Sequence, residues 1–484
     1  MQVKHNFCRT KIICTLGPAS DNEEIIRGLI KEGFDGARFN FSHGTHPEHL
    51  ERIQRFRKIE KEFGVKIPCI LDTKGPEIRL GKFDKPVILQ KGQKYTLTTK
   101  EVPGDINQAT VSYKGITKDI KPGNNVLIDD GLVELTVDNI TETDVVCTVK
   151  NPGKIDSNRG VNLPGIKATL PSLTEKDIGD LKFGVENGFD YVAGSFIRKK
   201  EDCLAIKKYL KEFGGEHIKL IAKIENQEGL DNFKEILLAS DGIMVARGDL
   251  GVEIPFEKIP IEQKKMIKKC CRAGKIVITA AQMLDSMINN PRPTRAEVTD
   301  ISNSIIDGSS AIMLSGETAS GNYPIESVHY MNKIALETEK HIDFMELSSS
   351  LRDFKNVDLS QQISYKKVID YSVCVTANLL KAAAIICVTV DGLSAAILSS
   401  YRAKAPIFAI TKNEQVARHL SLVWNVQPVF VESSINIRDL IQSGVEKLKE
   451  MKFLIPGDTV VITGDDEQNE GEHASTVSFV MNVK

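Results

Sequence analysis

Short apolar runs alternate with amphipathic stretches over the first 78 residues. Residues 11–16, 36–41 and 68–72 form apolar runs of strand length, and residues 47–63 carry apolar side chains at helical spacing. Between the first two runs, a capping-box sequence precedes another stretch with helical spacing. The pattern predicts strand, helix, strand, helix and strand, in that order.

The pattern changes between about residues 80 and 171, where helical spacing disappears. Short alternating runs replace it, and glycine-containing turns separate them. These runs cover residues 95–99, 126–128, 133–137 and 145–149. The stretch is therefore predicted to be an all-β insertion.

Strand and helix patterns resume at residue 174 and supply five more apolar runs of strand length. They are residues 191–196, 219–223, 242–246, 276–279 and 311–314. Together with the first three runs they make eight strands, each followed by a polar cluster. Parallel strands joined by helices, eight in number, favour a closed (β/α)8 barrel.

A separate αβ unit begins near residue 359, with apolar strands expected at 384–390, 407–410 and 459–462. The predicted fold class is α/β, with a TIM barrel, an inserted all-β lid domain and a C-terminal α/β domain. The expected boundaries are 1–78 and 171–345 for the barrel, 79–170 for the lid and 358–484 for the C-terminal domain.

Charge, apolar stretches and cysteine content indicate which partners and which cellular compartment to expect. The 63 basic and 65 acidic residues give a net charge of -2, which offers no electrostatic attraction to nucleic acid or to an anionic membrane. No apolar stretch reaches membrane-spanning length, and residues 1–10 lack the apolar core of a signal peptide. The cysteines are irregularly spaced without a CxxC pair, which is typical of a reducing compartment. We expect a cytoplasmic protein.

Active sites of parallel barrels lie at the C-terminal ends of the strands, so the polar residues that end each run are the candidates for chemistry. These residues are Arg38, Asn40, Ser42, His43, Asp72, Thr73, Lys74, Ser195, Lys223, Glu225, Arg247, Gly248, Asp249, Ser315 and Glu317, with Glu77 and Arg79 just beyond the third run.

Glu225 and Asp249 lie 24 residues apart, about one βα repeat, so neighbouring strands should carry them. Two convergent carboxylates with open positions suit Mg²⁺ or Mn²⁺. Helix capping by each carboxylate is the alternative interpretation. Lys223 precedes Glu225 by two residues and should point to the same side, where it would neutralise a transferring phosphoryl group or an enolate. A solvated lysine at the rim is the simpler alternative.

The turn after the sixth strand, at Gly248 and Asp249, exposes backbone N–H groups suited to a carboxylate or a phosphate, although ordinary tight turns account for most glycine pairs after a strand. The oxygen-bearing residues from Asn40 to Ser42 and from Asp72 to Thr73 either hold a monovalent cation or bond to one another. Arg38 and Arg79 either clamp phosphates or pair with carboxylates. The residues alone indicate a metal-dependent barrel for a phosphorylated carboxylate and leave a metal-dependent aldolase or lyase open.

The order of motifs resembles the pyruvate kinase family. The matching segments are residues 10–20, 37–44, 71–79, 160–165, 223–226, 243–251, 291–297 and 312–318, including Leu71-Asp-Thr-Lys-Gly-Pro-Glu-Ile-Arg79. They cover the barrel and the edges of the lid. The C-terminal third matches more loosely, best at residues 401–406 and 413–415.

The resemblance implies transfer of the phosphoryl group of phosphoenolpyruvate to ADP. In that family Glu225 and Asp249 would hold Mg²⁺, Lys223 would stabilise the transferring group, and Arg38 would bridge phosphates. K⁺ would be ligated by Asn40, Ser42, Asp72 and Thr73. Glu77 stands where potassium-dependent members carry glutamate, so we expect dependence on potassium.

Other positions of the resemblance concern the two substrates. Arg79, His43 and Arg159 would contact the nucleotide as the lid closes and excludes water. Substrate binding would involve Ser195, residue 281 and the backbone at Gly248 and Asp249. The family also suggests a homotetramer with small-molecule substrates and no nucleic acid or membrane partner.

Ala281 departs from the family, which usually has threonine there to help hold the substrate carboxylate. Losing one hydrogen bond to a charged group costs about 1.5–3 kcal/mol. Thr279 should point to the same side of the strand and replace part of that bond. A catalytically weak paralogue with a regulatory or binding role is therefore the alternative function, although the retained Lys223 and Glu225 argue against it.

Two further departures lie in the C-terminal domain. Residues 464–473 carry five carboxylates where the family tends to have a glycine-rich turn, and a solvated loop is the preferred interpretation over a partner site. Residues 389–395 occupy the place of a hydroxyl-rich phosphate cradle, but Val390 and Asp391 replace its usual residues.

We predict that fructose 1,6-bisphosphate leaves the activity unchanged, because the Asp391 carboxylate repels phosphate. Pyruvate formation at subsaturating phosphoenolpyruvate, with and without the sugar phosphate, measures this. Asp391→Ser serves as the matched variant and should bind the compound more tightly than the parent chain. Activation of the parent chain would contradict the prediction.

Overall fold

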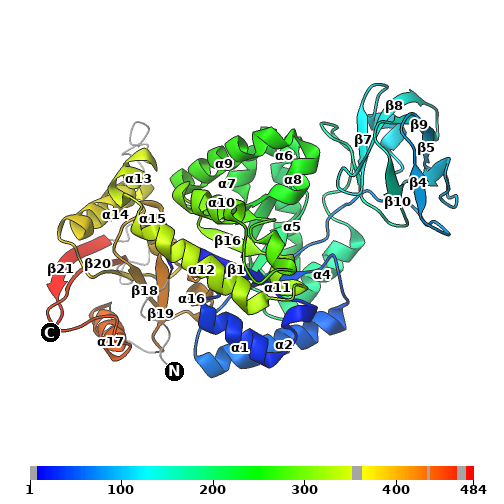
Figure 1. The fold of residues 1–484 in the computed structure, drawn as a ribbon. Helices are drawn as coiled ribbons and strands as arrows, with labels where there is room; N and C mark the ends of the chain where they lie inside the picture. Colours follow the sequence, from blue (N-terminus) through cyan, green and yellow to red (C-terminus); the bar gives the residue numbers. More distant parts are fainter. Residues whose placement is uncertain (1–7, 352–361, 433–436, 466–475) are drawn as a thin grey trace.

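The structure, a computed structural model, describes residues 8–351, 362–432, 437–465 and 476–484. Three bodies lie in a row, with the barrel in the middle, the β-rich lid at one end and the C-terminal domain at the other (Figure 1). This arrangement confirms the predicted fold class. In the described part of the chain, no helix is both long enough and apolar enough to cross a membrane.

Eight parallel strands close the barrel in the order β1-β16-β15-β14-β13-β12-β3-β2. Their bounds are β1 Lys11–Thr15, β2 Gly36–Asn40, β3 Cys69–Asp72, β12 Tyr191–Gly194, β13 Lys219–Ile224, β14 Gly242–Ala246, β15 Ile276–Ala280 and β16 Ala311–Leu314. Each apolar run that was expected to be a barrel strand is one, with ends shifted by at most two residues.

Helices surround the barrel. The longer ones are α1 Glu23–Glu32, α2 His46–Phe63, α4 Glu175–Glu186, α5 Lys200–Glu212, α9 Ile259–Ala273, α10 Arg295–Ile306 and α12 Pro324–Lys340. Shorter ones are η1 Pro18–Ser20, α6 Gln227–Asp231, α7 Phe233–Ala239, α8 Arg247–Glu253, η2 Phe256–Lys258, η3 Asp285–Ile288 and α11 Gly316–Ala319. Glycines end α1 and α2 and adopt the left-handed conformation there, with φ of 101° at Gly33 and 66° at Gly64.

Alternation along the strands divides the apolar residues between two cores. Residues such as Ile70, Ile221 and Ile278 point to the barrel axis and pack there with Met313. Their neighbours along the chain point outward and pack against the helices. Because the axis is filled with apolar side chains, polar residues that point inward gather at the mouth of the barrel.

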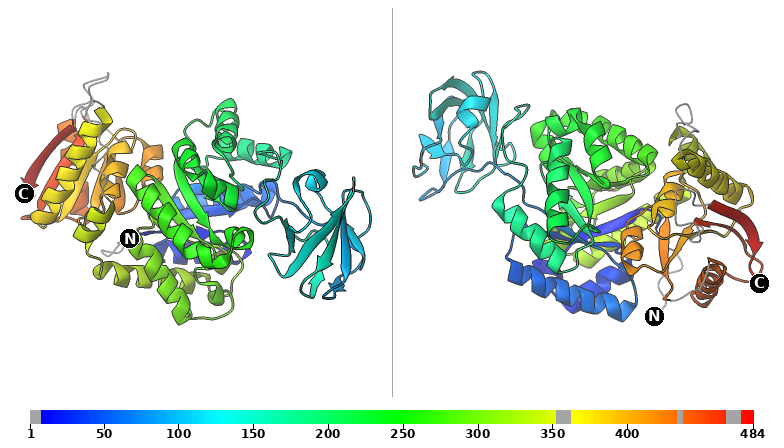
Figure 2. Two further views of the ribbon diagram at one scale, coloured as in Figure 1. Left: turned by 90° about the horizontal axis from the view of Figure 1, so that it is seen from above. Right: turned by 180° about the vertical axis from the view of Figure 1, so that it is seen from behind.

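The lid is inserted between β3 and α4 and projects away from the barrel (Figure 2). Its six-stranded sheet has the order β11-β7-β8-β9-β5-β6, and β10 pairs with β4. The bounds are β4 Val87–Leu89, β5 Lys94–Thr98, β6 Gln108–Thr110, α3 Ile116–Asp119, β7 Asn125–Ile128, β8 Val133–Ile140, β9 Asp144–Val149, β10 Gly153–Ile155 and β11 Val161–Asn162.

The C-terminal domain has a sheet in the order β19-β18-β17-β20-β21. Its strands are β17 Ala384–Val388, β18 Ile407–Thr411, β19 Val426–Phe430, β20 Thr459–Asp465 and β21 Thr476–Asn482. Its helices are α13 Phe344–Leu351, α14 Gln362–Leu379, α15 Leu393–Ser400, α16 Glu414–Leu420 and α17 Ile437–Glu450.

Two strands of this sheet were not predicted. Pro428 interrupts the pattern of β19, and proline is tolerated there because β19 is an edge strand. The strand expected at 384–390 ends earlier, at Val388, and Asp391 instead accepts a hydrogen bond from the Leu393 backbone N–H at 2.8 Å, at the start of α15. Most of the acidic run at 464–473 lies outside the described residues.

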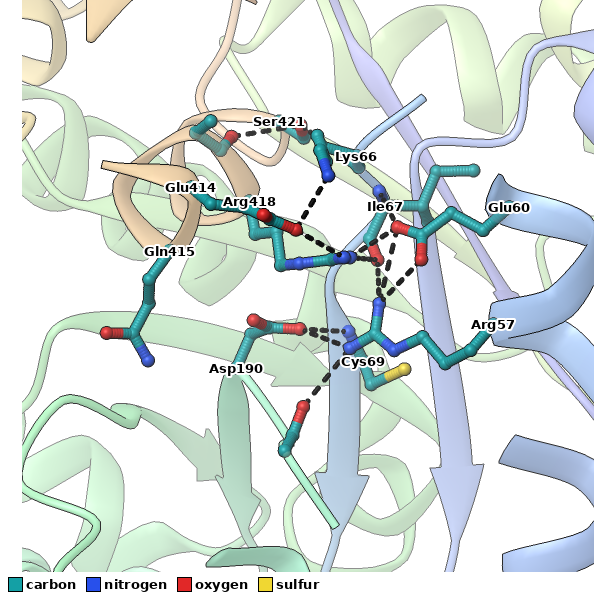
Figure 3. Close-up of polar contacts among 12 residues, drawn as sticks. Arg57, Glu60, Lys66, Ile67, Cys69, Asp190, Glu414, Gln415, Arg418 and Ser421 are labelled. Carbon is teal, nitrogen blue, oxygen red and sulfur yellow. Dashed lines mark hydrogen bonds and ion pairs between the residues drawn. The ribbon is translucent and has the colours of Figure 1, made fainter. Parts of the chain in front are cut away.

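A charged network joins α16 of the C-terminal domain to the bottom of the barrel (Figure 3). Glu60 on α2 is 3% exposed and pairs with both Arg57 and Arg418. Arg57 also donates to Asp190 at 3.0 Å, and Asp190 accepts the backbone N–H of Cys69 at 2.8 Å. The C-terminal domain is thereby connected to the first residue of β3.

We predict that Glu60→Ala lowers the free energy of unfolding by about 3 kcal/mol, because two arginines would lose their buried carboxylate. Chemical denaturation measures the change. Glu51→Ala is the matched control on the same helix, since the Glu51 side chain is 73% exposed and pairs with Arg55 alone in the described residues. Equal effects of the two substitutions would contradict the prediction.

Candidate active site

A cluster of four buried charges lies at the C-terminal mouth of the barrel. Asp72 ends β3 two residues after the inward-pointing Ile70, so its carboxylate also points inward. It accepts a hydrogen bond from Arg38 Nε at 2.6 Å and lies 3.1 Å from Lys223 Nζ. Lys223 Nζ lies 2.9 Å from Glu225 Oε1, which confirms that these two side chains share one side of the strand end.

Burial and charge act in opposite directions on these groups. Burial alone would raise the pKa of Asp72, but Arg38 and Lys223 outweigh it and hold the pKa below its usual value. Burial lowers the pKa of Lys223, and the carboxylates of Asp72 and Glu225 raise it further than burial lowers it. Lys223 therefore keeps its positive charge at neutral pH.

Glu225 is placed differently from Asp72. Burial, with the nearby charge of Asp249, raises the pKa of Glu225 to about 7 although Lys223 is close. Its Oε2 accepts the backbone N–H of Phe196, and its buried Oε1 forms the 2.9 Å ion pair with Lys223 Nζ. Lys223 thus already places a positive charge next to one oxygen of this carboxylate.

The structure tests whether a divalent metal fits. Among the described residues, no three His, Cys, Asp or Glu side chains gather as metal ligands, so the candidate site is the pair Glu225 and Asp249. Asp249 is exposed in the first turn of α8 and also lines the cleft described below. Mg²⁺ is commonly bound by one or two carboxylates, with water and substrate phosphates as further ligands. Glu225 and the exposed Asp249 fit this requirement, since the Asp249 charge is close enough to raise the pKa of Glu225.

The oxygen-bearing residues proposed for a monovalent cation come from adjacent strands. Asn40 and Asp72 are register partners of β2 and β3, so their side chains project to the same side. Asn40 Oδ1 accepts the Ser42 backbone N–H at 3.1 Å, and Thr73 Oγ1 accepts the Ser195 backbone N–H at 3.0 Å. Every candidate ligand is an oxygen, as hard cations require.

Ser195 connects the oxygen-bearing residues to the charged cluster. Its hydroxyl donates to the Thr73 carbonyl oxygen at 2.6 Å and accepts from Lys223 Nζ at 2.8 Å. Arg38 donates in addition to the hydroxyl of Thr15 at 2.9 Å. The structure therefore brings the predicted residues of β2, β3, β12 and β13 into one contiguous site.

A cleft of about 470 Å³ lies between the lid and the barrel next to this cluster. Glu77, Arg79, Arg159 and Asp249 line it, and of these Arg79 and Arg159 are the residues expected to contact the nucleotide. Arg79 Nε donates to Glu77 at 2.7 Å, and Arg159 pairs with Asp129 at 2.9 Å. The walls of the cleft thus contain two arginines and several carboxylates.

Two further residues line this cleft and were not among the candidates from the sequence. Asp129 and Asp130 line it, and burial and the Asp249 charge raise the pKa of Asp130. Their signal in the sequence, Asp130-Gly131, had been interpreted as a turn alone. His43 is exposed at the rim, where its carbonyl oxygen accepts from His49, and it does not line the described cleft.

Comparison with known proteins agrees with this geometry. A family profile described as "Pyruvate kinase, barrel domain" matches residues 7–328, and a second, "Pyruvate kinase, alpha/beta domain", matches residues 367–479. The chain belongs to the pyruvate kinase family. Pyruvate kinases are phosphotransferases, and this confirms the resemblance described from the motifs.

Relatives with high identity extend over nearly the whole chain. A pyruvate kinase of Clostridium acetobutylicum is 49% identical over 94% of this chain and 95% of its own length. One of Clostridium perfringens is 45% identical with the same coverage. One of Geobacillus stearothermophilus is 44% identical over 94% of this chain and 77% of its own length.

Ala281 lies where the pyruvate kinase resemblance places the substrate carboxylate. A methyl group added to Gly248 would lie 3.5 Å from Ala281 Cβ, so these two predicted residues are neighbours in space. Arg247 donates to the Ala281 carbonyl oxygen at 2.6 Å and pairs with both carboxylate oxygens of Asp300 at 2.7 Å. Ala281 itself has a φ of 72°, in the left-handed region.

The expectation that Thr279 replaces the missing hydroxyl is wrong. β15 ends at Ala280, and the left-handed Ala281 breaks the alternation on which the expectation depended. Ile278 and Ala280 point to the barrel axis, so Thr279 points outward between them. Its hydroxyl is buried and shares a 2.8 Å hydrogen bond with Ser309.

We predict that Ala281→Thr raises pyruvate formation on the order of 10-fold, by adding one hydrogen bond to a charged group. The same change should lower stability by about 1 kcal/mol, because a β-branched residue is strained at positive φ. Steady-state kinetics and thermal melting measure the two effects.

Ala281→Val is the matched control, since valine has the shape of threonine without its hydroxyl. It should show the loss of stability without the gain in rate. Equal rates for the threonine and valine variants would contradict the role assigned to the hydroxyl.

Proposed function

We propose that this chain transfers the phosphoryl group of phosphoenolpyruvate to ADP, giving pyruvate and ATP. The observation that carries the proposal is the charged Lys223, held between Asp72 and Glu225 beside a cleft that the lid covers. A buried cation of fixed position is suited to the negative charge that moves during phosphoryl transfer.

Lys223 and Arg38 would act directly on the substrates. Lys223 Nζ would stabilise the transferring phosphoryl group and the enolate that it leaves, and Arg38 would bridge phosphate oxygens. Both are held by Asp72, which fixes their positions before the substrate binds. Pre-organised charge of this kind needs little rearrangement at the moment of reaction.

Glu225 and Asp249 would hold Mg²⁺ or Mn²⁺. The bound ion would supply positive charge to the phosphate oxygens of both substrates. The support is the nearness of the two carboxylates, since the Asp249 charge raises the pKa of Glu225, and the exposure of Asp249. Burial favours the protonated form of Glu225, so metal binding would displace this proton.

K⁺ would be held by oxygens of Asn40, Ser42, Asp72 and Thr73. The support for potassium dependence is the position of Glu77, where potassium-dependent members of the family carry glutamate. The substrate carboxylate would bind at the Gly248 and Asp249 backbone beside residue 281, within reach of the turn that Arg247 stabilises.

The nucleotide would lie in the cleft between lid and barrel. Arg79 and Arg159 line this cleft, while His43 would reach the phosphates from the rim after the lid closes. Closure would exclude water, which otherwise competes for the phosphoryl group. A homotetramer belongs to the proposal through the family resemblance, and a cytoplasmic location through the cysteine pattern and the lack of a signal-peptide core in residues 1–10.

We expect pyruvate formation from phosphoenolpyruvate and ADP to require Mg²⁺ and to increase with K⁺. Lys223→Met should lower kcat on the order of 10²- to 10³-fold, because the charge next to the reacting oxygens is lost. Lys219→Met is the matched control at the opposite end of the same strand and should retain activity.

A parent chain without turnover would contradict the proposal and favour the catalytically weak paralogue. Thermal melting with ADP separates that alternative from the aldolase or lyase. ADP should stabilise a pyruvate kinase or its weak paralogue, whereas an aldolase or lyase should show no stabilisation by ADP.

A further inference from the structure

The first turn of α4 holds two strand ends that belong to the proposed monovalent-cation site. Lys176 Nζ donates to the Phe41 carbonyl oxygen at 2.8 Å, immediately before Ser42. Its neighbour Asp177 accepts the Gly75 backbone N–H at 3.0 Å, two residues after Thr73. Consecutive residues of one helix therefore fix both segments that would ligate the cation.

Asp177 divides its two oxygens between the helix and the loop. Oδ2 accepts the Thr174 backbone N–H at 2.9 Å and its hydroxyl at 2.6 Å, which caps α4. Oδ1 receives the Gly75 N–H, and the side chain is fully buried. Helix capping accounts for one oxygen, and the contact with Gly75 is an additional interaction that a cap does not require.

The loop that Asp177 holds has little freedom of its own. Gly75 has a φ of 74°, and a methyl group there would lie 2.7 Å from the Phe196 ring and 3.0 Å from Ser195 Cβ. Ser195 in turn bonds to Thr73 through its backbone N–H and its hydroxyl. A displacement of Gly75 would therefore move Thr73 and its contact with Ser195.

Lys176 is held in place by a second buried carboxylate. Its Nζ lies 2.7 Å from Asp180 Oδ2, and the other oxygen of Asp180 is 2.6 Å from His46 Nε2. The Asp180 side chain is 1% exposed. The ammonium group is thus fixed between this carboxylate and the Phe41 carbonyl.

We propose that Lys176 and Asp177 are positioning residues that set the separation between residues 40–42 and 72–73, and with it the affinity for a monovalent cation. The inference rests on the proposed function, because it assumes that these segments hold K⁺. Neither residue is among the proposed ligands. They act on the site through the backbone at Phe41 and Gly75.

Asp177→Asn tests the inference. The amide of asparagine has one oxygen in place of two, so the backbone N–H of either Gly75 or Thr174 would face an NH₂ group instead of an acceptor. Two quantities are measured as the K⁺ concentration increases: the rate of pyruvate formation, and the melting temperature of the protein without substrates. Tetramethylammonium chloride keeps the ionic strength constant. We expect the half-maximal K⁺ concentration to increase about 10-fold in both. The kcat at saturating K⁺ should change little.

Thr174→Ala is the matched control. It removes the hydroxyl from the α4 cap but leaves Asp177 and Gly75 bonded, so its K⁺ titrations should match those of the parent chain. Lys176→Met provides a second test should Asp177→Asn not fold, with the exposed Lys182→Met on the same helix as its control. Lys176→Met should also shift both titrations, whereas Lys182→Met should shift neither.

The outcomes separate this inference from the proposed function. Unshifted titrations in both Asp177→Asn and Lys176→Met, with a parent chain that responds to K⁺, would overturn the positioning role alone. Shifts in Thr174→Ala equal to those in Asp177→Asn would do the same and assign the effect to helix capping. A parent chain that forms pyruvate but ignores K⁺ in both titrations would overturn the potassium site together with this inference.

Discussion

In a closed parallel barrel, every second residue of a strand points to the axis, and the apolar interior leaves inward-pointing polar side chains a place only at the mouth. Asp72 and Lys223 follow inward-pointing isoleucines by two residues and therefore meet there. Arg38 and Glu225 reach the same place from their own strand ends. The charged cluster, the cation ligands and the cleft beside them all depend on this alternation.

The charges in the cluster depend on one another. Removing one member of a buried charge pair leaves its partner without compensation, which is far more costly than losing an exposed pair. Asp72 satisfies two cations at once, and the carboxylates of Asp72 and Glu225 together keep Lys223 protonated. This arrangement would stabilise a positive charge that binds near Glu225 and a negative charge that binds near Lys223 and Arg38.

Strand β3 is held at both of its ends. At the N-terminal end, Cys69 bonds to Asp190, which belongs to the network that Arg418 of the C-terminal domain completes (Figure 3). Beyond the C-terminal end, Gly75 is held by Asp177 at the start of α4. The strand that presents Asp72 therefore lies between a contact with the C-terminal domain and a contact with the helix that follows the lid.

The sequence by itself determined the barrel, because hydrophobic periodicity and strand ends are local patterns that can be recognised along the chain without its three-dimensional structure. It also placed Lys223 and Glu225 on one side. Only the tertiary structure decided that Thr279 and Ala281 do not share one side, since the left-handed Ala281 ends the alternation, and that Pro428 lies in an edge strand. Contacts such as Asp177 to Gly75 arise when the barrel closes and joins residues far apart along the chain, which no local pattern records.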